Sequence, residues 1–545
     1  MKPVSMAHTQ GLHGRLASIG GSHARVRIEA DALACLFEGL AVGSLLQIRA
    51  ARSFAVAVVT AIEECRERAG EVVADVDLLG EIALGRSGTW TFQRGISEYP
   101  PIRSAVELLH RDNLRLIYDV GAAETIEIGS LAQDPTIPAY VSLDEMLTKH
   151  FAVLGTTGVG KSTAVALVLR EVLAARPQQR VLLVDPHNEY GTSFGERAKV
   201  LTPSTFRLPY WMFSFEEIVD AIFRGRPGVD EEVDILAEAI PEAKALFAEG
   251  RDQGTASLRR AEADGGGFTV DSPVPYRLTD LVGLIDRRMG KLESRALVPR
   301  FQRLIARIES LSNDPRYRFM FQGATSDGDT MAAILTNLFN LDGRAQITVV
   351  QLAGFPGEIV DTILSVLCRT AFELGLWSGG AVPLLVVCEE AHRYAPGDRT
   401  LGFGPTRKAV SRIAKEGRKF GVSLGLVTQR PADLDPTIVS QCSTIFAMRM
   451  ANDRDQAIVR SAIPDAAAGL VASVSALGPR EAIAFGEGVA LPTRIRFGEL
   501  AAPHLPRATT IAQASGEGLD RWAIAKAVER WRSAGMCRRF KGAFE

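Results

Sequence analysis

The stretch Gly155-Thr156-Thr157-Gly158-Val159-Gly160-Lys161-Ser162 matches the pattern GxxxxGK[ST] at every fixed position. It follows an apolar segment, residues 151–154, and precedes a helical pattern over residues 163–173. A strand, a glycine-rich turn and a helix in this order form a loop whose backbone N–H groups and helix N-terminus attract phosphate. The alternative, a chance glycine turn before a helix, explains neither the lysine nor the serine. The stretch therefore predicts a P-loop nucleotide-binding fold.

We expect this loop to bind ATP with Mg²⁺. Lys161 should reach the β- and γ-phosphates, and the Ser162 hydroxyl should be a Mg²⁺ ligand. The predicted nucleotide contacts are the loop and the start of its helix: Gly155, Thr156, Thr157, Gly158, Val159, Gly160, Lys161, Ser162 and Thr163.

A second apolar segment, residues 384–388, ends in two carboxylates, Glu389 and Glu390. In open α/β sheets, ligands bind at the carboxyl ends of the strands. We expect Glu389 to hold Mg²⁺, usually through water, and Glu390 to orient and deprotonate the attacking water. His392 could position Glu390 or that water, or could be structural. The alternative for the acids is a solvated first turn of a helix.

A third strand, residues 423–428, ends in Thr428-Gln429-Arg430-Pro431. We interpret Gln429 as the sensor of the γ-phosphate; the alternative is a simple turn, because Pro431 biases Arg430 away from helix. Asp185-Pro186-His187-Asn188-Glu189-Tyr190 also follows a predicted strand and lies on the same rim, with no chemistry assigned to it.

Between residues 398 and 419, seven basic side chains face only two acidic ones, a net charge of +5. Arg399, Arg407 and Lys408 are candidate contacts to DNA phosphates, which would be independent of base sequence. The alternative is an ordinary solvated helix surface. If residues 406–419 form a helix, Arg418 lies beside its packed face, close to any neighbouring subunit. We therefore expect Arg418 to act as an arginine finger on the γ-phosphate of that subunit.

The pattern of predicted strands and helices indicates an α/β fold with an N-terminal small β-barrel or sandwich and a helical insertion. Residues 14–82 read as short strands with turn signals. From about residue 148, apolar strands alternate with helical segments, as in a parallel sheet covered on both faces. The predicted parts are a barrel at 1–100, a connecting segment at 101–148, the core at 149–209 and 341–500, the insertion at 210–340 and a C-terminal helical segment at 501–545.

Composition narrows the class of protein. The 545 residues exceed what one core usually accommodates, and 46% are hydrophobic and 23% charged, as in globular proteins. The formal net charge of −2 means that nucleic-acid contacts would need local basic patches. The six cysteines include no CxxC pair, which fits a reduced, cytoplasmic setting. No apolar stretch reaches the roughly 18 residues of a membrane span and no signal peptide is evident, so we expect no membrane association.

Taken together, five motifs in this order resemble the HerA family of hexameric DNA translocases, relatives of FtsK: residues 155–163, 185–190, 389–392, 416–421 and 428–431. The resemblance covers most of the chain, and the N-terminal strands resemble that family's β-barrel. It implies a RecA-like P-loop ATPase core with an N-terminal small β-barrel and a helical insertion. It implies the same roles for Lys161, Ser162, Glu389, Glu390, Gln429 and Arg418. One departure is Asn188, where the family usually has glycine; asparagine tolerates left-handed backbone better than most residues.

The resemblance also implies a homo-hexameric ring around DNA, with a partner nuclease or a sirtuin-like or other effector docked on the barrels. We therefore expect an ATP-dependent DNA translocase or helicase that acts in DNA end processing or antiphage defence. The alternative is an ATP-regulated hexameric platform that organises and activates an effector enzyme. A secretion or conjugation ATPase is disfavoured because no membrane segment is found.

Overall fold

The computed structural model describes residues 14–28, 40–65, 71–85, 88–118, 124–249, 267–291, 295–324, 330–463 and 468–507, with residues 525, 528 and 529. Packing divides the chain into two compact units. Unit 1 comprises residues 1–179, 387–398 and 414–505, and unit 2 comprises residues 180–386, 399–413 and 506–545. The C-terminal helical segment expected at 501–545 lies largely outside the described residues.

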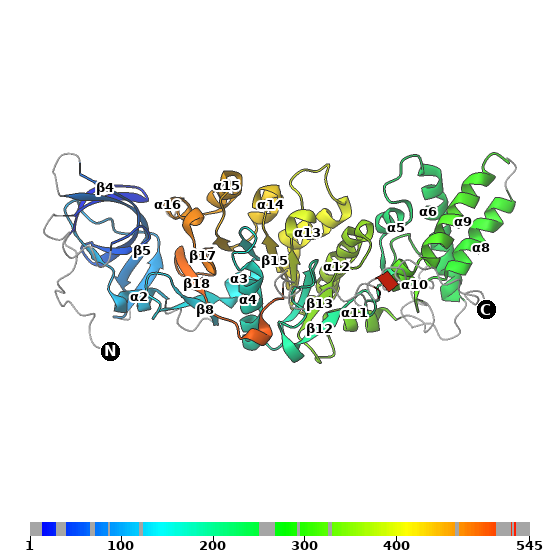
Figure 1. Ribbon diagram of the computed structural model, residues 1–545, viewed down its shortest axis with the longest axis horizontal. Helices are drawn as coiled ribbons and strands as arrows, with labels where there is room; N and C mark the ends of the chain where they lie inside the picture. The colour runs from blue at the N-terminus through cyan, green and yellow to red at the C-terminus, as the bar shows by residue number, and fades with distance from the viewer. Residues whose placement is uncertain are drawn as a thin grey trace. The chain divides into compact units, whose positions relative to one another are not determined.

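The N-terminal strands form a closed barrel. They are β1 (Gly14–Gly20), β2 (His23–Ile28), β3 (Leu45–Arg49), β4 (Ser53–Glu64), β5 (Val72–Leu84), β6 (Trp90–Arg94) and β7 (Ala105–Leu108). Their order is β2-β1-β7-β3-β4-β5-β6, and a β2–β5 pairing closes the barrel (Figure 1). Alternate side chains of β2, including Val26 and Ile28, point into the barrel core. The barrel extends past the boundary expected at residue 100, because it includes strand β7. This strand pairs with β1 and β3, and its Val106 is buried in the barrel core.

A second sheet has eleven strands in the order β12-β13-β11-β14-β15-β10-β16-β17-β18-β8-β9. The bounds are β8 (Thr125–Leu131), β9 (Pro138–Ser142), β10 (Phe151–Leu154), β11 (Arg180–Asp185), β12 (Ala198–Leu201), β13 (Ile347–Gln351), β14 (Leu384–Glu389), β15 (Val422–Thr428), β16 (Thr444–Met448), β17 (Glu481–Gly486) and β18 (Thr493–Phe497). The expected parallel pairing holds for β10 with β15 and β16, and for β13 with β11 and β12.

The parallel pairing expected from the sequence does not continue from β16 to β9. Strands β16, β17, β18, β8 and β9 pair antiparallel, each with the next. The connection between β17 and β18 covers only residues 487–492, too short for the crossover that a parallel pair needs. The connecting segment predicted at 101–148 accordingly supplies β7 to the barrel and β8 and β9 to this sheet.

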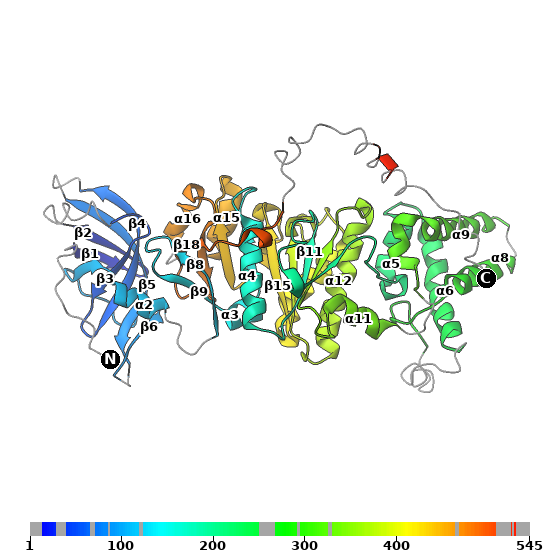
Figure 2. The same cartoon turned by 60° about the horizontal axis from the view of Figure 1, so that its bottom comes forward.

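The insertion at 210–340 is helical. Its elements are α5 (Phe215–Phe223), α6 (Asp230–Glu249), α8 (Leu278–Gly290), α9 (Val298–Asn313), α10 (Arg318–Phe321) and α11 (Met331–Phe339). Helices α6, α8 and α9 pack side by side (Figure 2). Arg288 of α8 bonds Glu238 and Glu242 of α6, which adds polar links around their buried apolar faces. Among the described residues, no helix is both long enough and apolar enough to cross a bilayer.

The remaining α-helices of the described residues are α2 (Arg111–Tyr118), α3 (Leu143–Thr148), α4 (Lys161–Ala175), α12 (Gly357–Trp377), α13 (Gly404–Glu416), α14 (Pro436–Val439), α15 (Asp453–Ala462) and α16 (Ala468–Val471). Strands β10 and β15 are buried along their whole lengths, as central strands of a covered sheet must be. Their register pairs Leu154 with Thr428 at the carboxyl ends. The phosphate loop and the predicted sensor therefore leave the sheet side by side, both in unit 1.

Candidate nucleotide-hydrolysis site

The loop between β10 and α4 has the backbone of a phosphate-binding loop. Three glycines take positive φ: Gly155 (158°), Gly158 (78°) and Gly160 (98°). At Gly155 a Cβ would lie 2.8 Å from the Cβ of Met448, so only glycine fits there. The Gly155 N–H donates to the carbonyl of Thr428 at 3.2 Å, and the Thr156 N–H donates to that of Arg449 at 3.0 Å. The loop is thus fixed to its two neighbouring strands.

Helix α4 begins at Lys161, and the preceding Gly160 provides no side-chain cap. The first-turn N–H groups are therefore left for an anion, which the helix dipole also favours. Lys161 is buried, and its Nζ donates to the carbonyl of Thr156 across the loop at 2.9 Å. Ser162 and Thr163 follow in the first turn and are partly exposed. This geometry fits the nucleotide contacts predicted from the sequence.

Both predicted carboxylates are buried, so the alternative of a solvated helix start is wrong. Glu389 ends β14 with 5% of its surface exposed, and Glu390 follows with 7%. Glu390 has a left-handed backbone, with φ 54° and ψ 44°, which costs a residue with a Cβ about 1 to 3 kcal/mol. Backbone strain of this kind concentrates at functional sites.

His392 joins Glu390 to the end of β15. Its Nδ1 lies 3.2 Å from Oε2 of Glu390 and 2.9 Å from Oγ1 of Thr428. The Thr428 hydroxyl is the hydrogen-bond partner of Nδ1, and the Glu390 carboxylate lies within ion-pair distance of the same nitrogen. Burial lowers the pKa of His392, and the negative charge of the nearby Glu390 opposes this shift. Of the alternatives left open for His392, the geometry fits the one in which it positions Glu390.

Gln429 lies at the carboxyl end of β15, partly exposed, and accepts a hydrogen bond from the hydroxyl of Thr157. The structure thus brings together the phosphate loop, Glu389, Glu390, His392 and Gln429, all in unit 1. Sequence reasoning missed Arg480, whose N–H donates to the carbonyl of Val159 at 2.9 Å. Its signal was weak, because a lone arginine before a strand has no diagnostic pattern.

The residues present fit Mg²⁺ held with a nucleotide. Among the described residues, no cluster of three or more His, Cys, Asp or Glu side chains could hold a metal ion alone. Mg²⁺ in nucleotide sites commonly uses few protein ligands, with phosphate oxygens and water completing its coordination. The Ser162 hydroxyl and the buried Glu389 carboxylate are suitable oxygen donors for this purpose.

Arg418 is exposed in the turn η5 (Gly417–Phe420), between α13 and β15. Within the described part of the chain, its guanidinium makes no hydrogen bond or ion pair. The seven residues of β15 separate this turn from Gln429, a distance of about 20 Å at the usual rise per residue. Arg418 is therefore not brought to the phosphate loop of its own chain.

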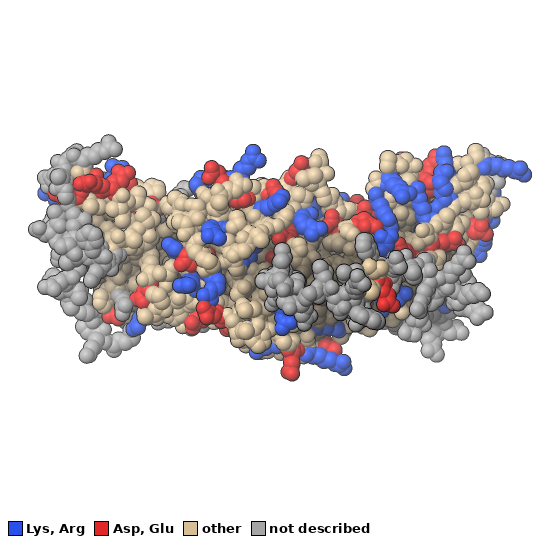
Figure 3. Space-filling model, in the orientation of Figure 1, with Lys and Arg blue, Asp and Glu red and all other residues tan. Residues whose placement is uncertain are grey.

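The candidate DNA contacts lie in unit 2. Arg399 is exposed, and its carbonyl accepts a bond from Nη1 of Arg407 at 3.2 Å. Lys408 lies 3.3 Å from the Glu216 carboxylate, a pair exposed on both sides and therefore weak. On the face drawn in Figure 3, basic and acidic side chains are interspersed. These contacts are local and leave Arg399 and Lys408 accessible to solvent.

The motif at 185–190 is structural in its described contacts. The Asp185 carboxylate is buried and accepts the N–H groups of Glu189 at 3.1 Å and Tyr190 at 3.0 Å. Burial raises the pKa of Asp185, and these hydrogen bonds oppose the rise. Asn188 has φ 59°, the left-handed conformation expected where the family usually has glycine. The turn therefore survives that substitution.

Comparison with known families identifies this architecture. Residues 126–371 match the family model described as the central domain of the helicase HerA. Over these residues, just under half of its length, the chain is similar to the HerA family. The match to this family model, the complete phosphate loop and the buried acids at β14 together make it an ATPase. The predicted fold class, a RecA-like core with an N-terminal barrel, is likewise confirmed.

Curated HerA proteins are similar over most of their length. The DNA double-strand break repair helicase HerA of Pyrococcus furiosus is 26% identical over 85% of this chain and 84% of its own. A probable DNA double-strand break repair helicase HerA of Methanocaldococcus jannaschii is 25% identical over 78% and 86%. Among solved structures, VirB4 of Thermoanaerobacter pseudethanolicus is similar with a TM-score of 0.46 and 14% identity, over 70% of this chain and 99% of that one.

Proposed function

We propose that the chain is an ATP-dependent DNA translocase or helicase that forms a hexameric ring and hydrolyses ATP at subunit interfaces. The HerA relatives named as DNA double-strand break repair helicases support the DNA-directed part of this proposal. The placement of Arg418 carries the proposal of shared sites. It is an exposed arginine without an ion pair in the described part of the chain, about 20 Å along β15 from its own chain's Gln429.

A guanidinium in this position fits the γ-phosphate of a neighbouring copy better than that of its own chain. Arginine is suited to this role because it remains charged and binds phosphate through a planar fork of donors. A site completed by a neighbour makes hydrolysis depend on assembly, and a repeated head-to-tail contact of this kind closes into a ring. We propose six copies, as the family resemblance implies.

Within one subunit, each predicted residue has a proposed task. Lys161 and the N–H groups of the loop bind the phosphates, and Ser162 and Glu389 hold Mg²⁺, which supplies charge neutralisation at the phosphoryl group. Glu390 accepts a proton from the attacking water, while His392 holds its carboxylate in place. Gln429 senses the γ-phosphate. The strained backbone and burial of Glu390 support its role as the base.

The remaining proposals concern DNA and partners. We propose that Arg399, Arg407 and Lys408 contact DNA phosphates, and that a partner nuclease, sirtuin-like enzyme or other effector acts with the ring in DNA end processing or antiphage defence. Phosphate contacts of this kind would make DNA binding fall steeply with added salt. Arg399→Ala and Lys408→Ala should each reduce that salt dependence by about one phosphate contact.

The first test measures ATP turnover with and without linear duplex DNA, together with mass in solution, for wild type, Lys161→Ala and Arg418→Ala. Both variants should be inactive although both assemble. Mixing the two inactive variants is the sharper measurement. Random mixed rings contain about a quarter of interfaces in which an intact loop faces an intact Arg418, so turnover should partly return.

The outcomes separate the alternatives. Full activity of Arg418→Ala alone, or no recovery in demonstrably mixed rings, would remove Arg418 from the shared site. ATP turnover that is the same with and without DNA would instead favour the ATP-regulated assembly platform. Glu390→Gln discriminates further, because a motor loses all activity when hydrolysis stops, whereas a platform still assembles and activates its effector.

A further inference from the structure

We propose that residues 469–490 couple the phosphate loop to the barrel, so that a nucleotide bound at the loop also stabilises the barrel. This stretch, the coupling segment, contacts the barrel at both of its ends and the phosphate loop near its middle, all within unit 1. The inference rests on the proposed nucleotide function. It adds a route by which an effector on the barrel would respond to ATP.

Arg94 attaches the barrel to one end of the coupling segment. It is the last residue of barrel strand β6, and its guanidinium donates to three carbonyls of the connection between β17 and β18. Nε donates to the carbonyl of Ala490 at 3.1 Å, and Nη2 donates to that of Gly486 at 2.8 Å and to that of Val489. Arginine suits this contact because its donors form a rigid planar fork.

The connection between β17 and β18 is itself fixed to the sheet. Gly486 has φ 109°, and a Cβ there would lie 1.8 Å from the Ser443 carbonyl oxygen, so only glycine fits. The Glu487 N–H donates to the same carbonyl at 2.7 Å, and the Gly488 carbonyl accepts the Ser142 N–H at 2.8 Å. The carbonyls that face the barrel are therefore held in place by the sheet and move only with it.

The other end of the coupling segment packs against barrel strands β4 and β5. A Cβ at Gly469 of α16 would lie 2.4 Å from the Thr60 side chain, so any larger residue would collide with the barrel. The Gly469 N–H also donates to the carboxylate of Asp77, which is buried in β5. The next two residues, Leu470 and Val471, are buried. This end is therefore attached to the barrel by close packing and by a hydrogen bond to a carboxylate.

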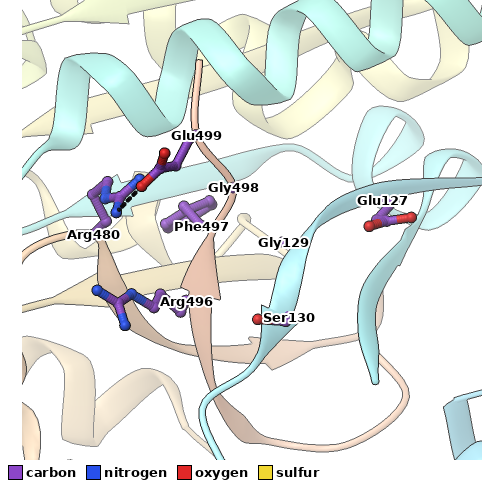
Figure 4. Close-up of a pocket in the computed structure, with 8 residues that line it drawn as sticks. All are labelled: Glu127, Gly129, Ser130, Arg480, Arg496, Phe497, Gly498 and Glu499. Atoms are coloured by element: carbon purple, nitrogen blue, oxygen red, sulfur yellow. Dashed lines mark hydrogen bonds and ion pairs between the residues drawn. The ribbon is translucent and has the colours of Figure 1, made fainter. Parts of the chain in front are cut away.

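Arg480 connects the middle of the coupling segment to the phosphate loop. Its N–H donates to the Val159 carbonyl at 2.9 Å, and its own carbonyl accepts the Phe497 N–H at 2.8 Å. Its φ of 62° is unusual for a residue with a Cβ, and these two bonds maintain it. Nη2 of Arg480 donates to Oε1 of Glu499 at 2.8 Å, and Figure 4 shows the two side chains directed toward each other. A change in the loop at Val159 therefore acts on a residue that only strand β17 separates from the Arg94 contact.

The consequence for nucleotide binding follows from mass action. A ligand that binds only the folded loop stabilises every part of the chain whose opening also opens the loop. Because the coupling segment links the barrel to the loop, ATP should reduce the opening of both. At about 100 times its Kd, ATP would reduce the population of the open form by up to about 100-fold. Hydrogen exchange of buried barrel amides reports that population.

The test measures hydrogen exchange of the full chain by mass spectrometry, with and without ATP and Mg²⁺, in a Glu390→Gln background that does not consume ATP. Peptides from α4 report the loop, and peptides from β5 report the barrel. In the parent, ATP should slow exchange in both. In Arg94→Ala the slowing should persist in α4 but fall below about twofold in β5, and Arg94→Lys, which keeps the charge without the fork, should be intermediate. Arg49→Ala, at the exposed end of barrel strand β3, is the matched control and should behave like the parent.

Two results would overturn the proposal while leaving nucleotide binding intact. One is slowing in α4 without slowing in β5 of the parent. The other is slowing of β5 that survives both in Arg94→Ala and in Gly469→Val, which crowds Thr60 at the other end of the coupling segment. If ATP slows exchange in neither peptide, the proposed nucleotide function itself fails. Exchange of β5 without ATP shows whether each variant barrel is folded, and Arg94→Lys decides the comparison if the barrel of Arg94→Ala is not.

Discussion

Nδ1 of His392 lies 3.2 Å from Oε2 of Glu390. Burial lowers the pKa of the imidazole from its usual value of 6.5, so His392 is neutral at pH 7 and positions the carboxylate without neutralising it. The same nitrogen lies 2.9 Å from the Thr428 hydroxyl, whose backbone carbonyl accepts the Gly155 N–H. Glu390 is therefore connected to Gly155 of the phosphate loop through His392 and Thr428.

The first prediction is a change in the pH profile of ATP turnover. Protonated His392 would form an ion pair with Glu390 and make it a weaker base, so wild-type turnover should fall as the pH drops below the lowered pKa of His392. His392→Gln keeps a hydrogen-bond donor but does not titrate, and its acid limb should move to lower pH. His110→Gln, at an exposed histidine, is the control. Identical acid limbs in wild type and His392→Gln would assign that limb to another group.

How much of this site follows from sequence alone can be judged residue by residue. The loop from Gly155 to Ser162 and the acids after residues 384–388 were predicted because local patterns specify them: glycines for positive φ, and an apolar strand before a carboxylate. The left-handed turn at Glu390 could not be predicted, since no local pattern requires it. Arg480 was missed because tertiary packing, not spacing, brings it to Val159.

The parts of the fold that the sequence did not predict also depend on tertiary packing and not on local patterns. The buried strands β10, β14 and β15 were found from their apolar runs, but runs of four to six residues do not specify their partners. The antiparallel pairing of β18 with β8 depends on contacts between residues more than 300 positions apart, such as Phe497 with Gly129.

The second prediction concerns stability and His150. This residue is buried, its Nδ1 accepts the Leu424 N–H at 3.0 Å, and its Nε2 lies 3.0 Å from the Ala414 carbonyl. The ring is therefore neutral, with its proton on Nε2, and burial lowers its pKa from 6.5. Below pH 6.5 the unfolded chain binds a proton that the folded chain does not, so the free energy of unfolding should fall as the pH decreases through this range.

The measurement is urea unfolding at pH 7.5 and pH 5.5. His150→Asn should lose about 1 to 3 kcal/mol at pH 7.5, because the buried partners of the ring lose a hydrogen bond, and should show a smaller decrease on acidification. Asparagine is chosen because it tolerates the φ of 65° at this position. His110→Asn should retain the wild-type decrease. An unchanged pH dependence in His150→Asn would contradict the proposed neutral ring.

The third prediction compares one substitution at two glycines. Gly425 of β15 is paired with Phe151 of β10, and a Cβ there would lie 2.7 Å from the Phe151 ring. Gly425→Ala should lower the free energy of unfolding by about 1 to 3 kcal/mol by overpacking the core. Gly283→Ala in α8 meets no atom within 4 Å and should raise it by about 0.5 to 1 kcal/mol through helix propensity. Equal effects at the two positions would contradict the close packing at β15.

The fourth prediction separates sensing from structure at Gln429. Its Oε1 accepts a bond from the Thr157 hydroxyl, so it could either tether the loop or contact the γ-phosphate. Gln429→Ala should reduce ATP turnover about 100-fold, the cost of one transition-state donor, with unchanged ADP affinity. Gln429→Glu decides between the two roles, because it preserves the acceptor for Thr157 but replaces the amide donor with a negative charge. If Gln429→Glu keeps wild-type turnover, Gln429 acts only as the acceptor that holds Thr157. If its turnover falls as far as that of Gln429→Ala, the amide of Gln429 faces the γ-phosphate.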